Sequence, residues 1–133
     1  MKLSIIVIMT AALFASSALA LAANPTAPLS TPELKNTIAS KGKPTLIFFQ
    51  NPNGGPCKAQ KVVLDTLTVQ RKGSFNIANV NAMNQSDQKA FNDYGVRSLP
   101  SLVLVDRVGK INRVFPPGIQ NSEAISSALD GLK

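Results

Sequence analysis

The sequence contains one cysteine, no histidine and no tryptophan among its 133 residues. Without histidine the chain has no Ser-His-Asp triad, no Cys-His pair and no imidazole ligand for a metal. A single cysteine cannot close an internal disulfide, and it excludes both a disulfide scaffold and a zinc site of four thiolates. Any covalent chemistry must therefore use one thiol or scattered carboxylates, and we expect no metal and no other cofactor.

Acidic residues are also few. The sequence has 7 Asp and Glu and 14 Lys and Arg, so its net charge is +7. The basic residues are spread along the chain, whereas nucleic-acid binding favours a clustered stripe or stacking aromatics. We therefore expect a mildly basic surface that favours acidic partners, and no nucleic-acid binding. Five aspartates lie too far apart in sequence to indicate a paired-carboxylate site, and we expect them to be solvated: Asp65, Asp87, Asp93, Asp106 and Asp130.

The first twenty residues carry a single charge, at Lys2, followed by an apolar stretch and the site Ala18-Leu19-Ala20. A basic start, a short apolar run and an Ala-x-Ala site are typical of a secretory signal peptide. The apolar part is shorter than the roughly 20 residues that a membrane-spanning helix needs. We therefore predict a signal peptide over residues 1–20 and an exported protein, periplasmic or secreted, with no membrane association after cleavage.

The remaining chain divides into a leader and one domain. Residues 21–30 hold two prolines and no periodicity, which predicts a flexible leader. The domain covers residues 31–133. At its start, Ser30-Thr31-Pro32-Glu33 fits a capping box that opens a helix to about Ser40. Residues 45–49 are continuously apolar, which is typical of a strand buried on both faces. After a loop rich in Gly, Pro and Asn, apolar residues at helical spacing predict a helix to about Gln70.

The second half of the domain continues the alternation of strands and helices. The pattern predicts a strand near residues 75–80, a short helix from Ser86 to Tyr94, a buried strand at 102–105, its hairpin partner at 111–115 and a terminal helix. This order favours an α/β layer structure with right-handed crossovers and an antiparallel edge. We predict a central mixed sheet of about four strands flanked by helices.

Residues 46–58, Leu-Ile-Phe-Phe-Gln-Asn-Pro-Asn-Gly-Gly-Pro-Cys-Lys, resemble the strand-to-helix segment of thioredoxins, whose motif is Cys-Gly-Pro-Cys-Lys. Residues 94–101, Tyr-Gly-Val-Arg-Ser-Leu-Pro-Ser, are similar to the family segment that ends in a cis-proline before a buried strand. Gly118 matches a glycine after the edge hairpin. The resemblance covers about residues 31–133, without a clear counterpart of the family's first strand. The resemblance implies that the chain has a thioredoxin-like fold and that it belongs to the thiol-disulfide oxidoreductase family.

The sequence departs from the thioredoxin pattern at three positions. Gly54 stands where the family has its attacking cysteine, and Cys57 aligns with the second, resolving cysteine. Phe48 aligns with the family's buried acid, and Asn53 aligns with its tryptophan. The resemblance therefore implies that Cys57 is poorly exposed, that it has no partner thiol and that dithiol chemistry is impaired or lost.

Each candidate site residue has two interpretations. Cys57 is a surviving redox thiol or a small buried hydrophobic residue. The segment Gly54-Gly55-Pro56 is a helix start that faces a peptide or an ordinary turn, and it lacks the glycine spacing and the Ser/Thr of a phosphate loop. If the Leu99–Pro100 bond is cis, the resemblance implies that the backbone of Leu99 pairs with an extended peptide.

Three functions remain open from the sequence. The first is an exported thioredoxin-family protein with at most monothiol chemistry at Cys57, through a mixed disulfide with a thiol-bearing envelope protein. The second is a binding module that uses Gly54, Leu99 and Pro100 to hold an extended peptide segment of such a protein. The third is a Cys-to-Gly variant of an active dithiol enzyme. We expect a monomer, because a dimer through Cys57 needs an exposed sulfur.

Overall fold

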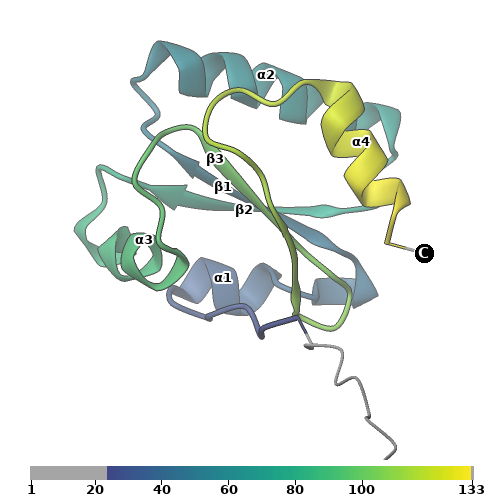
Figure 1. The fold of residues 1–133 in the computed structure, drawn as a ribbon, viewed down its shortest axis with the longest axis horizontal. Coiled ribbons are helices and arrows are strands. Elements are labelled where there is room, and N and C mark those ends of the chain that lie inside the picture. Colours follow the sequence, from purple (N-terminus) through teal and green to yellow (C-terminus); the bar gives the residue numbers. More distant parts are fainter. Residues whose placement is uncertain (1–23, 133) are drawn as a thin grey trace, which may run out of the picture.

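Four strands form one mixed sheet between two layers of helices (Figure 1). The strands are β1 (Thr45–Gln50), β2 (Asn76–Asn81), β3 (Ser101–Val105) and β4 (Ile111–Val114), in the order β2-β1-β3-β4. β1 is parallel to β2 and antiparallel to β3, and β3 pairs antiparallel with β4. This arrangement confirms the four-stranded mixed sheet that the sequence predicts.

The computed structural model describes residues 24–132, so the predicted signal peptide lies outside the described residues. Within this range, no helix has both the length and the apolar character needed to cross a membrane. The helices are α1 (Pro32–Thr37), α2 (Gly55–Gln70), α3 (Gln88–Tyr94) and α4 (Ser122–Asp130), together with the short 3-10 helices η1 (Ser40–Gly42) and η2 (Gln85–Asp87).

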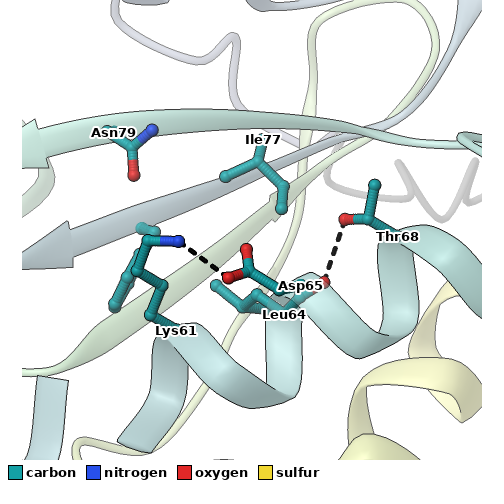
Figure 2. Close-up of a pocket in the computed structure, with 7 residues that line it drawn as sticks. Lys61, Leu64, Asp65, Thr68, Ile77 and Asn79 are labelled. Atoms are coloured by element: carbon teal, nitrogen blue, oxygen red, sulfur yellow. Dashed lines mark hydrogen bonds and ion pairs between the residues drawn. The ribbon is translucent and has the colours of Figure 1, made fainter. Parts of the chain in front are cut away.

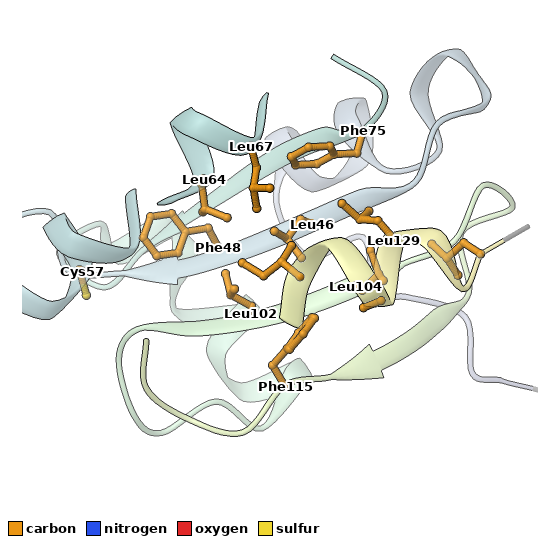
Figure 3. Close-up of a cluster of buried hydrophobic side chains, with 13 residues drawn as sticks. Leu46, Phe48, Cys57, Leu64, Leu67, Phe75, Leu102, Leu104, Phe115 and Leu129 are labelled. Atoms are coloured by element: carbon orange, nitrogen blue, oxygen red, sulfur yellow. The ribbon is translucent and has the colours of Figure 1, made fainter. Parts of the chain in front are cut away.

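The central strand β1 supplies residues to a hydrophobic core on each face of the sheet. Leu46 and Phe48 belong to the cluster beneath α2 and α4 (Figure 3). Ile47 and Phe49 belong to the cluster that faces α1 and α3. All four side chains are at most 1% exposed, which confirms that β1 is buried on both faces. α2 and α4 cover one face in Figure 1, and α1 and α3 cover the other.

Helix α1 differs from its prediction at both ends. Thr31 is the N-cap, and its Oγ1 accepts the amide of Leu34 at 3.1 Å. Glu33 does not complete the predicted capping box, because its carboxylate accepts the amide of Asn79 in β2 at 2.9 Å. The helix ends at Thr37 and not near Ser40. The chain leaves the helical conformation there, since Ala39 has a left-handed φ of 58°.

Residues 24–30 differ from the flexible leader expected from their composition. Ala27 is 1% exposed, and its amide donates to the carbonyl of Gly109 at 2.9 Å. The Pro25 carbonyl accepts the amide of Ile111, so this segment pairs with the turn between β3 and β4. The hydroxyl of Tyr94 donates to the Pro28 carbonyl at 2.7 Å. These long-range contacts cannot be recognised from local sequence, which shows only two prolines.

Replacing Tyr94 tests how firmly this segment is held. Tyr94→Phe removes the hydroxyl but keeps the ring that packs at 5.4 Å from the ring of Phe49. We expect the free energy of unfolding to fall by about 1 kcal/mol, the usual net value of one hydrogen bond. Denaturant unfolding at neutral pH measures this loss, and an unchanged midpoint would contradict it.

The pH dependence of the free energy of unfolding gives a second test of the hydrogen bond between Tyr94 and Pro28. Burial, and secondarily the charge of Asp93, raise the pKa of Tyr94 above its usual value. The unfolded chain therefore loses this proton first, so the stabilising contribution is complete below about pH 10 and declines above it. Wild-type protein should lose stability above that pH more steeply than Tyr94→Phe.

The end of α2 places a lysine where glycine is usual. The amide of Gly73 donates to the Thr68 carbonyl and that of Lys72 donates to Val69, which is the Schellman pattern. Lys72 has a left-handed φ of 54°, which costs a residue with a Cβ about 1–2 kcal/mol.

We expect Lys72→Gly to raise the free energy of unfolding by about 0.5–1 kcal/mol in denaturant titrations. Lys72→Ala is the control, because it removes the same side chain and keeps the strain; equal effects would refute this explanation.

Candidate functional site

The loop between β1 and α2 is organised by Asn51, which the sequence analysis did not single out. Its side-chain Oδ1 accepts the amide of Asn53 at 3.0 Å, and its carbonyl accepts the amide of Gly54 at 2.9 Å. Its own amide donates to Sγ of Cys57 at 3.4 Å. The Asn-Pro dipeptide at 51–52 is a known turn signal that could have identified this residue.

Cys57 lies in the first turn of α2 and is buried. Its side chain is 3% exposed and lies at one end of the hydrophobic cluster beneath α2 and α4 (Figure 3). This position agrees with the low exposure that the resemblance implies. A buried sulfur that accepts a hydrogen bond from a backbone amide cannot readily attack an external disulfide, because exchange requires access to the attacking thiolate.

Gly54 caps α2 in an ordinary extended conformation, with φ −78° and ψ 133°. A side chain is therefore compatible with this backbone. A Cβ built at Gly54 would lie 3.7 Å from Sγ of Cys57 and 3.3 Å from the Asn51 carbonyl oxygen. Gly55 and Pro56 are exposed in the first turn of the helix. Position 54 thus lies directly over the buried sulfur, without a side chain of its own.

The segment before β3 lies at the same end of the sheet. Phe49 near the end of β1 is paired with Ser101 at the start of β3, so the residues after β1 and before β3 emerge from neighbouring strands. The Leu99–Pro100 peptide bond is cis, as the resemblance implies. Pro100 is buried and Leu99 is half-buried. The Pro100 carbonyl accepts the amide of Gly118 at 3.0 Å, which adds the third matching segment to this end of the molecule.

The two other departures from the thioredoxin pattern differ in burial. Phe48 is 1% exposed and packs in the same cluster as Cys57, so an apolar ring fills the position expected for a buried acid. Asn53 is exposed on the loop. The interior behind Cys57 is therefore hydrophobic, and over residues 24–132 no Asp or Glu side chain is buried.

A pocket of about 330 Å³ lies between α2 and β2 (Figure 2). Phe48, Leu64 and Ile77 give it an apolar lining, and the ion pair of Lys61 with Asp65, at 2.7 Å, lies between the helix and the strand. The pocket is lined by neither Gly54 nor Pro100, so we do not assign it to the candidate site.

Three of the five scattered aspartates are exposed, as expected (Asp65, Asp93 and Asp130), and all five also have individual structural partners. Asp65 and Asp93 pair with lysines four residues away, and Asp130 pairs with Arg71. Hydrogen bonds from Lys89 and from Ser30 hold the pKa of Asp93 below its usual value. Backbone amides donate to the carboxylates of Asp87 and Asp106. Over residues 24–132, no three His, Cys, Asp or Glu side chains come together as a metal site.

The sequence analysis also missed Gln60, which is fully buried in α2. Its Nε2 donates to the Gln120 carbonyl at 3.0 Å, and its Oε1 accepts the Gln120 amide at 2.6 Å. This pair fixes the loop that contains Gly118 against α2. A glutamine on an apolar helix face is a weak signal, because the same residue is usually solvent-exposed.

Comparisons with known proteins agree with this geometry. A family model described as a thioredoxin-like domain matches residues 32–133. Thioredoxin 1 of Nostoc sp. is 30% identical over 80 residues, which cover 60% of this chain and 73% of that protein. A thioredoxin of Synechocystis sp. is 27% identical over 102 residues, which cover 77% of this chain and 92% of the relative.

Solved structures give the same fold. The X-ray structure of Fasciola hepatica thioredoxin is similar with a TM-score of 0.58 at 22% identity, over 70% of this chain and 84% of that one. The germline-specific thioredoxin Deadhead of Drosophila melanogaster gives a TM-score of 0.60 at 18% identity, over 71% of this chain and 86% of that one.

Proposed function

Since the chain belongs to the thioredoxin-like family, we propose that it is an exported thiol-disulfide oxidoreductase-like protein that has lost dithiol exchange. It holds an extended segment of another envelope protein at the surface around Gly54, Leu99 and the buried Pro100, which we call the Gly54–Pro100 surface. Chemistry at Cys57 is at most that of a single thiol.

The observation that carries this proposal is the burial of Cys57, the one cysteine in the sequence. Dithiol exchange needs an accessible thiolate to attack and a second thiol to resolve the mixed disulfide. Gly54 occupies the place of the attacking cysteine, and Cys57 is 3% exposed behind it. Binding requires neither thiol, so it is the part of the family's activity that these residues can still perform.

The chemistry of the Gly54–Pro100 surface supports a peptide as its partner. Thioredoxins are known to pair substrate backbones beside the cis-proline, and strand addition of this kind derives its affinity from main-chain hydrogen bonds. The nearby charged side chains of Lys58 and Arg97 are exposed and basic. An extended segment with acidic residues is therefore the favoured partner.

A second candidate function follows from the contact between Gly54 and Cys57. Gly54 lies next to the buried sulfur and has no side chain, and a Cβ there would lie 3.7 Å from Sγ. If the loop opens, the Cys57 thiolate can attack a disulfide of a small thiol or a protein. The old sulfur–sulfur bond then breaks, a mixed disulfide forms at Cys57 and the displaced sulfur leaves as a thiolate.

Thiol reactivity and peptide binding separate the two candidates. We expect Cys57 in the native protein to react with Ellman's reagent at least about tenfold more slowly than in urea, because reaction requires local opening.

Peptide binding is measured by NMR titration. An acidic unstructured peptide should shift the amide resonances of Gly54 and Leu99, and the same peptide should cause equal shifts in the Cys57→Ala variant. A basic peptide of the same length is the control.

Two results would contradict the binding proposal. One is native Cys57 that reacts as fast as in urea and forms a stable mixed disulfide with oxidised glutathione, which would favour monothiol chemistry. The other is loss of peptide binding in Cys57→Ala while Arg97→Glu still binds the acidic peptide normally.

A further inference from the structure

The outer edge of β2 is a strand edge that its own sequence does not protect. β2 is the first strand in the order β2-β1-β3-β4, and among residues 24–132 only β1 pairs with it. Its six residues, Asn-Ile-Ala-Asn-Val-Asn, include no charged residue and no proline, and its register with β1 is uninterrupted from Asn76 to Asn81. Lysine, proline and bulges are the usual devices that prevent an edge strand from pairing with another chain.

The direction of the backbone amides shows which groups face outward. The amide of Asn76 donates to Pro44 and that of Ala82 donates to Gln50, both at 2.8 Å and both toward β1. Amides alternate in direction along a strand, so those of Ile77, Asn79 and Asn81 point away from the sheet.

Carboxylates accept hydrogen bonds from two of these three outward-facing amides. Oε1 of Glu33, in α1, accepts the amide of Asn79 at 2.9 Å. Oδ2 of Asp87, in η2, accepts the amide of Asn81 at 2.8 Å. Hydrogen bonds to ionised acceptors are about twice as strong as neutral ones. An approaching strand would have to displace both carboxylates.

Both acids lie near the start of a helix. Glu33 is in the first turn of α1, and Asp87 occupies the N-cap position of α3, but its side chain makes no capping hydrogen bond there. The carboxylates bond β2 instead. Thr31 already caps α1, so only Asp87 gives up a capping bond. Carboxylates from two unrelated points in the sequence nevertheless reach the same strand edge, which indicates a common role there.

We propose that Glu33 and Asp87 are edge caps, which prevent β2 from pairing with the β2 strand of a second copy of this chain. A second copy is the relevant partner because it offers an identical uncharged six-residue edge. Antiparallel pairing about a two-fold axis then bonds each strand to the other reciprocally. The proposal does not depend on the function of the Gly54–Pro100 surface.

The decisive variant is Glu33→Ala with Asp87→Ala, and the control is Asp65→Ala with Glu123→Ala. Both double variants raise the net charge by two, from +7 to +9, so both increase repulsion between copies equally. We expect light scattering after size exclusion to give the mass of one chain for the wild type and the control. The edge-cap variant should shift to the mass of two chains as its concentration rises.

A third substitution tests the location of the contact. Adding Asn79→Pro to the edge-cap variant removes an outward amide, and proline is tolerated on the free side of an edge strand. We expect it to restore the mass of one chain. A folded edge-cap variant that stays monomeric at every concentration would overturn the proposal, as would dimerisation of the charge-matched control.

Hydrogen exchange provides a test that does not require association. In the monomer, Glu33→Ala should speed exchange of the Asn79 amide about tenfold, as expected for the loss of one charge-assisted hydrogen bond. The amide of Ala78, which faces β1, should be unchanged. If Asn79 exchange does not respond to Glu33→Ala, the carboxylate does not cap this edge and the proposal is wrong.

Discussion

Gly54→Cys is expected to convert the chain into a protein with an intramolecular disulfide between positions 54 and 57. The backbone at Gly54 already has the extended conformation that a cysteine adopts, and its Cβ would lie 3.7 Å from Sγ of Cys57. A side-chain rotation can bring the two sulfurs to a bond length of about 2.0 Å. The Asn51 carbonyl oxygen, at 3.3 Å from that Cβ, has only to move by a few tenths of an ångström.

The new cysteine also has a chemical advantage over Cys57. It would stand at the N-cap of a sixteen-residue helix, where unpaired amides and the helix dipole favour a thiolate. We expect Gly54→Cys to gain catalysis of insulin reduction by dithiothreitol from a wild-type level of none. The rate should stay below that of an ordinary thioredoxin, because Phe48 replaces the buried acid that the family resemblance associates with proton transfer.

Gly55→Cys is the matched control for this prediction. It adds the same residue one position later, where a Cβ has no neighbouring atom within 4 Å, so Cys57 lies out of reach. Mass spectrometry after oxidation should find the internal disulfide in Gly54→Cys alone. Two free thiols in oxidised Gly54→Cys would show that the loop geometry is wrong, and a disulfide without insulin reduction would show that the rest of the site no longer supports exchange.

The second large effect is expected from Phe48→Asp, which restores an acid at the family position. Phe48 is 1% exposed among Leu46, Leu64 and Leu102. Removing a buried aromatic ring costs about 3–5 kcal/mol, and burying a carboxyl group adds to this. Because a domain is stable by only about 5–15 kcal/mol, denaturant unfolding should show a loss of at least about 4 kcal/mol at pH 7.

The loss should also depend on pH. Burial raises the pKa of the introduced carboxyl group above its unfolded value of about 3.9. The folded form then binds the proton more tightly, so the loss is smallest below about pH 4 and grows as pH rises toward the folded pKa. Phe48→Leu is the control, with a loss of about 1 kcal/mol and no pH dependence. An equal loss in both variants would mean that the site admits water and tolerates an acid.

Much of the fold could be predicted because its signals are local. The apolar run of β1, the helical spacing in α2 and the turn residues at Gly73 and Gly95 each act within a few residues. The order of elements then restricts the topology through chain connectivity. The short helix α1 and the leader were predicted less well, since the left-handed conformation at Ala39 and the bonds of residues 25–28 depend on distant partners.

At the candidate site, the available thiol chemistry follows from the residue types alone. One cysteine excludes an intramolecular dithiol pair, and the resemblance puts Phe48 at the position of the family's buried acid. The motif order also indicated which segments belong together.

The positions of those groups, in contrast, depend on how the chain packs. Sheet register brings the end of β1 beside the start of β3, packing leaves Cys57 3% exposed, and Glu33 and Asp87 turn from their helices to the edge of β2. Burial and hydrogen-bond direction depend on contacts between residues tens of positions apart, and local propensity carries no information about them. The residue types therefore limit the thiol chemistry to one cysteine, and the packing sets which surfaces the protein can offer.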